Sequence, residues 1–136
     1  MDYDFKPTST SDDSIKAVLE LLKLVFPKAY KFTYEYIKWQ YKDNPNGEVV
    51  GYDAYIDDIL VAHYATIPIQ MKICGRRRKG LLSLNTATHP DHRGKGLFSI
   101  LANTTFALAH DLGYEFVIGA ANANSTYGFL KNLGFY

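Results

Sequence analysis

The chain has 136 residues, which suits one domain spanning residues 1–136 and is too short for two ordinary ones. Hydrophobic residues make up 47% and charged residues 21%, which indicates a soluble globular protein rather than a disordered one. The net charge of +1 excludes a global field that would steer the protein to nucleic acid or to an anionic membrane. The single cysteine, Cys74, excludes an internal disulfide. The polar N-terminus and the lack of an apolar run of about 18 residues favour a cytoplasmic protein without a membrane span.

The first half of the chain predicts one strand and two helices. A short strand is expected at residues 2–6. The stretch TSTSDD then supplies a helix cap and two aspartates where the helix dipole favours negative charge. Apolar residues follow at helical spacing as far as Phe26, and Pro27 ends the run. A second helix, rich in aromatic residues, is expected at residues 33–41, before the turn cluster DNPNG.

Three successive antiparallel strands are predicted in the middle of the chain. Residues 49–56 form the first, and Asp57-Asp58 is predicted as a hairpin turn. Residues 59–73 form the second, in which Pro68 indicates a bulge or a sheet edge. The sequence CGRRRKG turns the chain, and residues 80–88 form the third strand.

The remaining elements are a helix at 97–112, a buried strand at 114–121 and a short helix at 124–133. This order predicts an α/β or α+β fold, in which a mixed, largely antiparallel sheet is flanked by helices on both faces.

The segment HPDHRGKG lies between a predicted strand and a predicted helix. A helix N-terminus offers unpaired N–H groups and a positive dipole end. Gly94 and Gly96 allow the backbone to approach a ligand closely, and Arg93 and Lys95 add positive charge. This combination favours a phosphate or pyrophosphate site, although both GxxxxGK[ST] and GxGxxG are absent. The alternative is an exposed turn with solvated basic side chains.

Two longer stretches carry a family resemblance. TATHPDHRGKGLFSIL resembles motif A of the GNAT superfamily of acyl-CoA-dependent N-acyltransferases, and NSTYGFLKNLGF resembles its motif B. The element order from the first helix onward is also similar to that family. The stretch WQYKDNPNG, followed by a strand, is similar to the Eis-like bacterial acetyltransferase branch.

The resemblance implies a binding site for the cosubstrate acetyl-CoA. The pantetheine arm would pair with the strand at Thr86, Ala87 and Thr88, and an N–H near Asn85 or Thr86 would stabilise the oxyanion. Arg93 and Asn124 belong to the same implied site. The N–H groups implied to cradle the pyrophosphate are those of Gly94, Lys95, Gly96, Leu97, Phe98 and Ser99.

The chain departs from the family pattern at two places. Phe98 stands where the family has a small residue, and this changes helix packing under the pyrophosphate. Leu130 stands where the family often has a tyrosine that protonates the leaving thiolate. Tyr127 lies three residues earlier, about one helical turn away, and is the candidate substitute.

An N-acyltransferase also needs a base for the amine proton. The strand at residues 81–88 has no carboxylate, where the family often keeps a glutamate. His89, His63 and Glu115 are the candidate bases, and each also has a structural or exposed interpretation. His89 and His92 lack a carboxylate or cysteine cluster, so no metal is expected.

Two further clusters have alternative interpretations. The basic tip Arg76-Arg77-Arg78-Lys79 is expected at the far end of the sheet from the glycine segment, as a solvated hairpin that limits aggregation. Aromatic side chains in and before the second helix form either a core with its rim or part of an acceptor site. These are Tyr30, Phe32, Tyr34, Tyr36, Trp39 and Tyr41.

Taken together, the resemblance implies an N-acetyltransferase that transfers an acetyl group from acetyl-CoA to a primary amine by direct attack. The acceptor is expected to be a small-molecule or peptide amine, with no nucleic-acid or membrane partner. The first alternative is a non-catalytic acyl-CoA-binding module, and the second is nucleic-acid binding through the basic tip.

The chain ends directly after motif B, where the family usually has two more strands. We therefore expect a truncated domain with an open sheet edge at residues 114–121. Such an edge favours a homodimer and weak activity of the chain alone. A fully active monomer would contradict this expectation.

Overall fold

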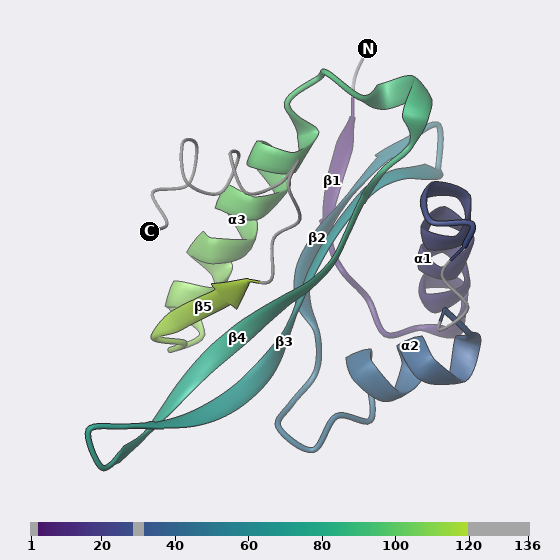
Figure 1. The fold of residues 1–136 in the computed structure, drawn as a ribbon. Coiled ribbons are helices and arrows are strands. Elements are labelled where there is room, and N and C mark those ends of the chain that lie inside the picture. Colours follow the sequence, from purple (N-terminus) through teal and green to yellow (C-terminus); the bar gives the residue numbers. More distant parts are fainter. Residues whose placement is uncertain (1–2, 29–31, 120–136) are drawn as a thin grey trace.

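The computed structural model describes residues 3–28 and 32–119. Five strands form one sheet in the order β1-β2-β3-β4-β5 within these residues; the first three pairings are antiparallel and β4 pairs with β5 in parallel. Figure 1 shows α1 and α2 on one face of the sheet and α3 on the other. The predicted mixed, largely antiparallel sheet with helices on both faces is confirmed. The elements are β1 (Asp4–Pro7), α1 (Asp12–Val25), α2 (Tyr34–Tyr41), β2 (Val50–Ile56), β3 (Ile59–Ile73), β4 (Arg76–Thr88), η1 (Pro90–His92), α3 (Leu97–Asp111) and β5 (Phe116–Gly119).

Both N-terminal helices begin with a side-chain cap. The Ser11 side chain accepts a hydrogen bond from the Ser14 N–H, and the Thr33 side chain accepts one from the Tyr36 N–H. Such caps satisfy N–H groups that the first helical turn leaves without intrahelical acceptors. Thr33 was predicted as the first helical residue of α2; it is the cap instead.

The two tight turns account for the lengths of β3 and β4. Asp57 and Asp58 have φ of 50° and 64°, which is the conformation that a two-residue β-hairpin requires. Cys74 and Gly75, at φ 51° and 78°, form a second turn of the same kind. Because this turn uses only two residues, the predicted start of β4 at Gly80 is wrong. The strand begins at Arg76, which pairs with Ile73.

Pro68 lies on a locally free edge of β3. It pairs with Leu81 of β4, whereas the register with β2 ends at Val50↔Thr66. A proline lacks the N–H that a second neighbouring strand would need, so this position suits it. Of the two predicted alternatives, the edge is therefore confirmed. The two register shifts lie elsewhere, at Ala54–Tyr55 in the pairing of β2 with β3 and at Tyr64–Thr66 in the pairing of β3 with β4.

Apolar side chains form a layer on each face of the sheet. Ile15, Val18 and Leu22 of α1 pack with Ile37 and Tyr41 of α2 on one face. On the other face, a separate cluster of buried side chains lies between α3 and the sheet, and it comprises Ala54, Val61, Ala62, Tyr64, Leu97, Leu101 and Ala102. The sheet is thus held between two cores, and its central strands are removed from water.

The remaining boundaries differ slightly from expectation. β1 begins at Asp4, and Asp2 lies outside the described residues. α3 ends at Asp111, followed by Gly113 at φ 87°. β5 begins at Phe116 rather than at Tyr114, because the Tyr114 N–H bonds back to the Ala109 carbonyl at the end of α3. The end of the strand predicted at 114–121 and the helix predicted at 124–133 lie outside the described residues.

Gly51 of β2 has no room for a side chain. A Cβ there would lie 2.3 Å from the Tyr64 carbonyl oxygen and 2.9 Å from Thr8 Oγ1. We predict that Gly51→Ala destabilises the fold by about 1–3 kcal/mol, because overpacking forces the backbone of β3 to shift. Equilibrium denaturation measures this change. A loss below about 0.5 kcal/mol, which is typical of a surface substitution, would contradict the prediction.

Candidate functional site

The segment between β4 and α3 has the backbone conformation of an open loop. Gly94 and Gly96 have φ of 78° and 72°, a region that other residues rarely adopt. A Cβ at either position would meet no atom within 4 Å, so the space beside both glycines is open. Gly96 is the N-cap of α3 and supplies no side-chain hydrogen bond. The positive end of the α3 dipole faces this loop, and no acidic residue in the first turn of α3 neutralises it.

The side chains around this loop leave its backbone accessible. Arg93 and Lys95 are exposed, whereas Leu97 is buried in the core beneath α3. Phe98, the departure from the family pattern, packs edge-on against the Tyr64 ring at 5.9 Å between centroids. Its bulk is therefore directed at the sheet. Ser99 is half-buried on the same turn.

The strand that leads into the loop has two different edges. β4 pairs with β3 along its length, with Tyr64↔Thr86, His63↔Ala87 and Ala62↔Thr88 in the last part. Its parallel register with β5 covers only Gly80 to Ser83 within the described residues. In Figure 1, β5 lies beside the middle part of β4, away from the glycine loop. The segment predicted to pair with pantetheine therefore begins beyond the described β5 pairing.

A β-bulge interrupts β4 at this point. Tyr64 pairs with Thr86 and Thr66 pairs with Ser83, so Leu84 and Asn85 together stand opposite Ala65 alone. A bulge of this kind leaves the extra residue outside the regular ladder and re-aims its neighbours. Asn85, the residue predicted near the oxyanion, is one of the two bulged residues and is buried.

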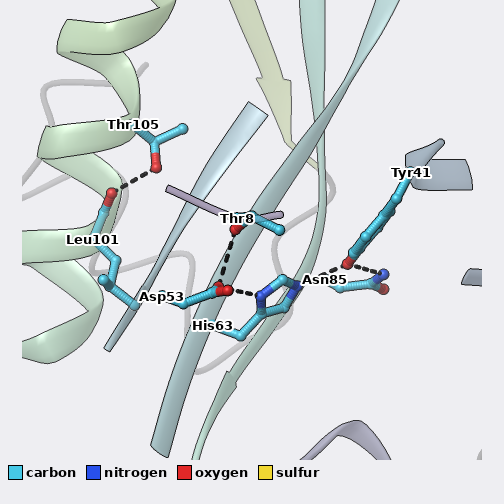
Figure 2. A network of polar contacts seen from close by, with 7 residues as sticks. All are labelled: Thr8, Tyr41, Asp53, His63, Asn85, Leu101 and Thr105. Atoms are coloured by element: carbon cyan, nitrogen blue, oxygen red, sulfur yellow. Dashed lines mark hydrogen bonds and ion pairs between the residues drawn. The ribbon is translucent and has the colours of Figure 1, made fainter. Parts of the chain in front are cut away.

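A chain of buried hydrogen bonds extends from Asn85 into the core (Figure 2). Asn85 Nδ2 donates to the Tyr41 hydroxyl at 2.9 Å, and that hydroxyl lies 2.7 Å from His63 Nε2. His63 Nδ1 lies 2.6 Å from Asp53 Oδ1, which also accepts from Thr8 Oγ1 at 3.0 Å. Tyr41, His63 and Asp53 are at most 1% exposed. Tyr41, Asp53, His63 and Asn85 come from α2, β2, β3 and β4, so these hydrogen bonds link one helix and three neighbouring strands.

The donors and acceptors in this chain have one consistent order. With His63 neutral and its proton on Nδ1, the Nδ1–H donates a hydrogen bond to the Asp53 carboxylate, and Nε2 accepts one from the Tyr41 O–H. The Tyr41 oxygen in turn accepts from Asn85. Burial raises the pKa of the Tyr41 phenol well above its usual value, so the hydroxyl keeps the proton that it donates.

The other histidines and acid–base candidates that the sequence analysis discussed lie in separate places. His89 follows the end of β4, and its Nδ1 accepts from the Asp91 N–H at 3.1 Å. His92 Nδ1 lies 2.9 Å from the Tyr3 hydroxyl. Glu115 forms an exposed ion pair with Arg78 at 2.7 Å, and Figure 1 shows this end of β4 far from the loop. Tyr127 and Asn124 lie outside the described residues.

The predicted position of the basic tip agrees with the structure. The β3–β4 hairpin carries Arg76 and Arg77, and its tip lies at the end of the sheet that is opposite to the glycine loop (Figure 1).

Among the predicted aromatic cluster, Tyr41 and Phe32 are core residues, while Trp39 is 57% exposed. Tyr30 lies outside the described residues. Within residues 3–28 and 32–119, no group of three or more potential metal ligands is present, and no helix there is long and apolar enough to cross a membrane.

A cavity of about 350 Å³ lies between α1, the β2–β3 turn and the end of β4. The polar residues of its lining are Glu20, Asp58 and His89. The apolar part of the lining comes from Ala17, Leu21, Leu24, Ile59 and Leu60. Since His89 joins β4 to the glycine loop, this cavity adjoins the start of that loop.

Sequence reasoning identified the loop but missed Asp53 and the role of Tyr41. His63 was considered only as an isolated base. The available signal was the single carboxylate within the apolar strand VGYDAYI, because a buried carboxylate requires partners. Tyr41 could not be separated from its aromatic neighbours by pattern alone.

Comparisons with known proteins agree with this architecture. The family model described as "Acetyltransferase (GNAT) domain" matches residues 6–136. A comparison with curated proteins finds no match.

Solved structures share the fold at low identity. A GCN5-related N-acetyltransferase from Ralstonia eutropha is 16% identical with a TM-score of 0.80, over 99% of this chain and 93% of that chain. A predicted acetyltransferase from Clostridium acetobutylicum, solved with acetyl-CoA, is 14% identical with a TM-score of 0.81, over 99% and 90%. Glucosamine-6-phosphate N-acetyltransferase from Arabidopsis thaliana is 14% identical with a TM-score of 0.75, over 100% and 92%. Since the family model spans nearly the whole chain, the protein belongs to the GNAT acetyltransferase family.

Proposed function

We propose that the protein is an N-acetyltransferase that moves the acetyl group of acetyl-CoA directly to a primary amine. The observation that carries this proposal is the open backbone at Gly94 and Gly96, placed at the N-terminus of α3. N–H groups and a positive helix end suit a pyrophosphate. Within the family, the WQYKDNPNG stretch favours the Eis-like branch.

The cosubstrate would lie along β4 and the loop. Arg93 and Lys95 would supply charge to the pyrophosphate, and Asn124 completes the proposed site. The pantetheine arm would pair with the segment from Thr86 to Thr88, on the edge that the described part of β5 leaves uncovered. The pyrophosphate would accept hydrogen bonds from the backbone of Gly94, Lys95, Gly96, Leu97, Phe98 and Ser99.

The reaction needs no covalent enzyme intermediate. The amine lone pair attacks the thioester carbonyl carbon, and the carbonyl π electrons move to oxygen. An N–H near Asn85 or Thr86 would stabilise that oxyanion. Collapse re-forms the carbonyl and breaks the C–S bond. The CoA thiolate takes a proton from Tyr127, and the amine proton passes to His89, directly or through water.

The cavity beside His89 favours a cationic acceptor. Its lining includes the acidic residues Glu20 and Asp58, and apart from His89 the other lining residues are apolar. An ammonium group attached to a partly apolar body fits this combination, which suits a small-molecule or peptide amine.

A turnover assay distinguishes this function from a non-catalytic acyl-CoA-binding module. Free thiol release from acetyl-CoA is measured with alkyl amines, amino sugars, polyamines and lysine peptides, each beside the matching alcohol. We expect thiol release with at least one class of amine, acetylated amine by mass spectrometry and no reaction with the alcohols. CoA binding without thiol release for every amine would favour the binding module.

Gly96→Val tests the cosubstrate site. We predict that it weakens CoA binding by about 1–3 kcal/mol, because the side chain fills the open space and N–H contacts are lost. The matched control is Gly75→Val at the hairpin tip, where φ is 78° and the space beside the glycine is also open. Calorimetry should show weaker CoA binding only for Gly96→Val. Equal affinity of the two folded variants would exclude the loop as the site.

Tyr127→Phe tests the proposed proton donor. We predict that kcat falls by about 10²-fold, the effect of removing an acid catalyst, with little change in the KM of the amine. Tyr114→Phe, which removes the hydroxyl of a ring that lies under the Lys79 ammonium, is the control and should keep full activity. A kcat within about twofold of the wild-type value for Tyr127→Phe would rule out this role.

A further inference from the structure

The proposed reaction assigns no role to the buried hydrogen-bonded residues Asp53, His63 and Tyr41. Four polar side chains lie in the core here, and each removal of a polar group from water costs free energy unless it is hydrogen-bonded. Well-packed apolar residues in such positions are often as stabilising or more so. The chain is nevertheless continuous from Asp53 to Asn85 (Figure 2). This continuity indicates that the hydrogen-bonded residues have a role other than stabilising the fold.

The chain ends on a residue whose backbone is irregular. Asn85 is bulged from the β3–β4 ladder, so regular pairing fixes its orientation less than that of its neighbours. Its side-chain amide is instead held by the Tyr41 hydroxyl at 2.9 Å. Tyr41 itself is held by His63, and His63 by a carboxylate that Thr8 also contacts.

The direction of the hydrogen bonds fixes the orientation of the Asn85 side chain. With the His63 proton on Nδ1, every donor points from Asn85 toward Asp53, and the carboxylate of Asp53 is the last acceptor. A hydrogen bond to an ionised acceptor is stronger than one between neutral groups. The carboxylate of Asp53 thus fixes the ring proton of His63 on Nδ1, and Nε2 is left to accept from Tyr41. Each hydrogen bond therefore determines which atom of the next residue donates and which accepts.

We propose that Asp53, His63 and Tyr41 are positioning residues that hold the Asn85 bulge so that a backbone N–H at Asn85 or Thr86 points at the thioester carbonyl oxygen. The inference rests on the proposed acetyl transfer. Donors in an oxyanion site must lie about 2.7–3.1 Å from the developing charge. A misplacement of about 1 Å can lower the rate by about 10²-fold. A fixed bulge would meet this demand, whereas a mobile one would not.

Tyr41→Phe removes the central link and keeps the ring. Asp53→Asn keeps the shape of its side chain and removes the charge. We expect both variants to lower kcat by roughly tenfold or more, while the KM of acetyl-CoA stays within about twofold. The matched control is Thr105→Val, which deletes a buried hydroxyl bonded at 2.7 Å to the Leu101 carbonyl, outside the chain (Figure 2). It should lose stability and keep kcat.

A second measurement reports on the bulge without an amine. In wild type, amide NMR signals of Asn85 or Thr86 should shift more with acetyl-CoA than with CoA, because only acetyl-CoA has the carbonyl acceptor. In Tyr41→Phe or Asp53→Asn this difference should disappear, while the signals of Gly94 and Gly96 still shift on binding. This result would support the positioning role even if no amine in the panel reacted, so failure of the proposed transfer is recognised separately.

Two results would overturn the inference. One is a kcat in Tyr41→Phe and Asp53→Asn that falls no further than in Thr105→Val. The other is an acetyl-specific shift at Asn85 and Thr86 that is unchanged in both variants. If Tyr41→Phe does not fold, the isosteric Asp53→Asn decides the question by the same two measurements.

Discussion

β4 pairs with β3 from Arg76 to Thr88, and this antiparallel ladder determines where the bulge and the glycine loop lie. The ladder places the bulge in the middle of the domain and the glycine loop at its end. Apolar layers on both faces keep the two strands in register, since a slip by one residue would exchange the faces of all their side chains. The loop and the bulge are therefore placed relative to one another by a rigid element.

The same strand is paired unequally on its two sides. β3 accompanies it throughout, whereas the described β5 accompanies only Gly80 to Ser83. A strand with one free edge offers backbone groups to an extended ligand in the way that a neighbouring strand would. Under the proposed function, this edge would bind a long, flexible cosubstrate through main-chain geometry, which tolerates wide variation of side chains. The low identities to the structural neighbours agree with such tolerance.

Local patterns in the sequence predicted most of the described elements. The cap before α1, the turn at Asp57-Asp58 and the full extent of β3 are encoded within a few residues of where they act. The glycine loop was predictable for the same reason. The start of β4 was missed because strongly charged residues rarely signal a strand, and only the pairing with β3 makes them one.

The buried chain of hydrogen bonds was not predictable from local patterns. Its members are separated by 10 to 44 residues along the chain, and they meet only after the sheet and α2 have packed. The bulge also hides Asn85. Leu82, Leu84 and Ala87 all contact the core beneath α1, although strict alternation would assign Ala87 to the other face. Only the observed register reveals which face Asn85 occupies.

The β3–β4 hairpin tip segregates the charge of an almost neutral molecule. Lys72, Arg76, Arg77, Arg78 and Lys79 lie on it, and with a total of +1 the rest of the chain carries four net negative charges. Lys72 stands directly opposite Arg77, an arrangement that destabilises a strand pair. Dissolved salt screens such repulsion over about 10 Å at 0.1 M. The hairpin tip should therefore be held together more firmly as ionic strength rises, whereas its exposed ion pair between Arg78 and Glu115 weakens.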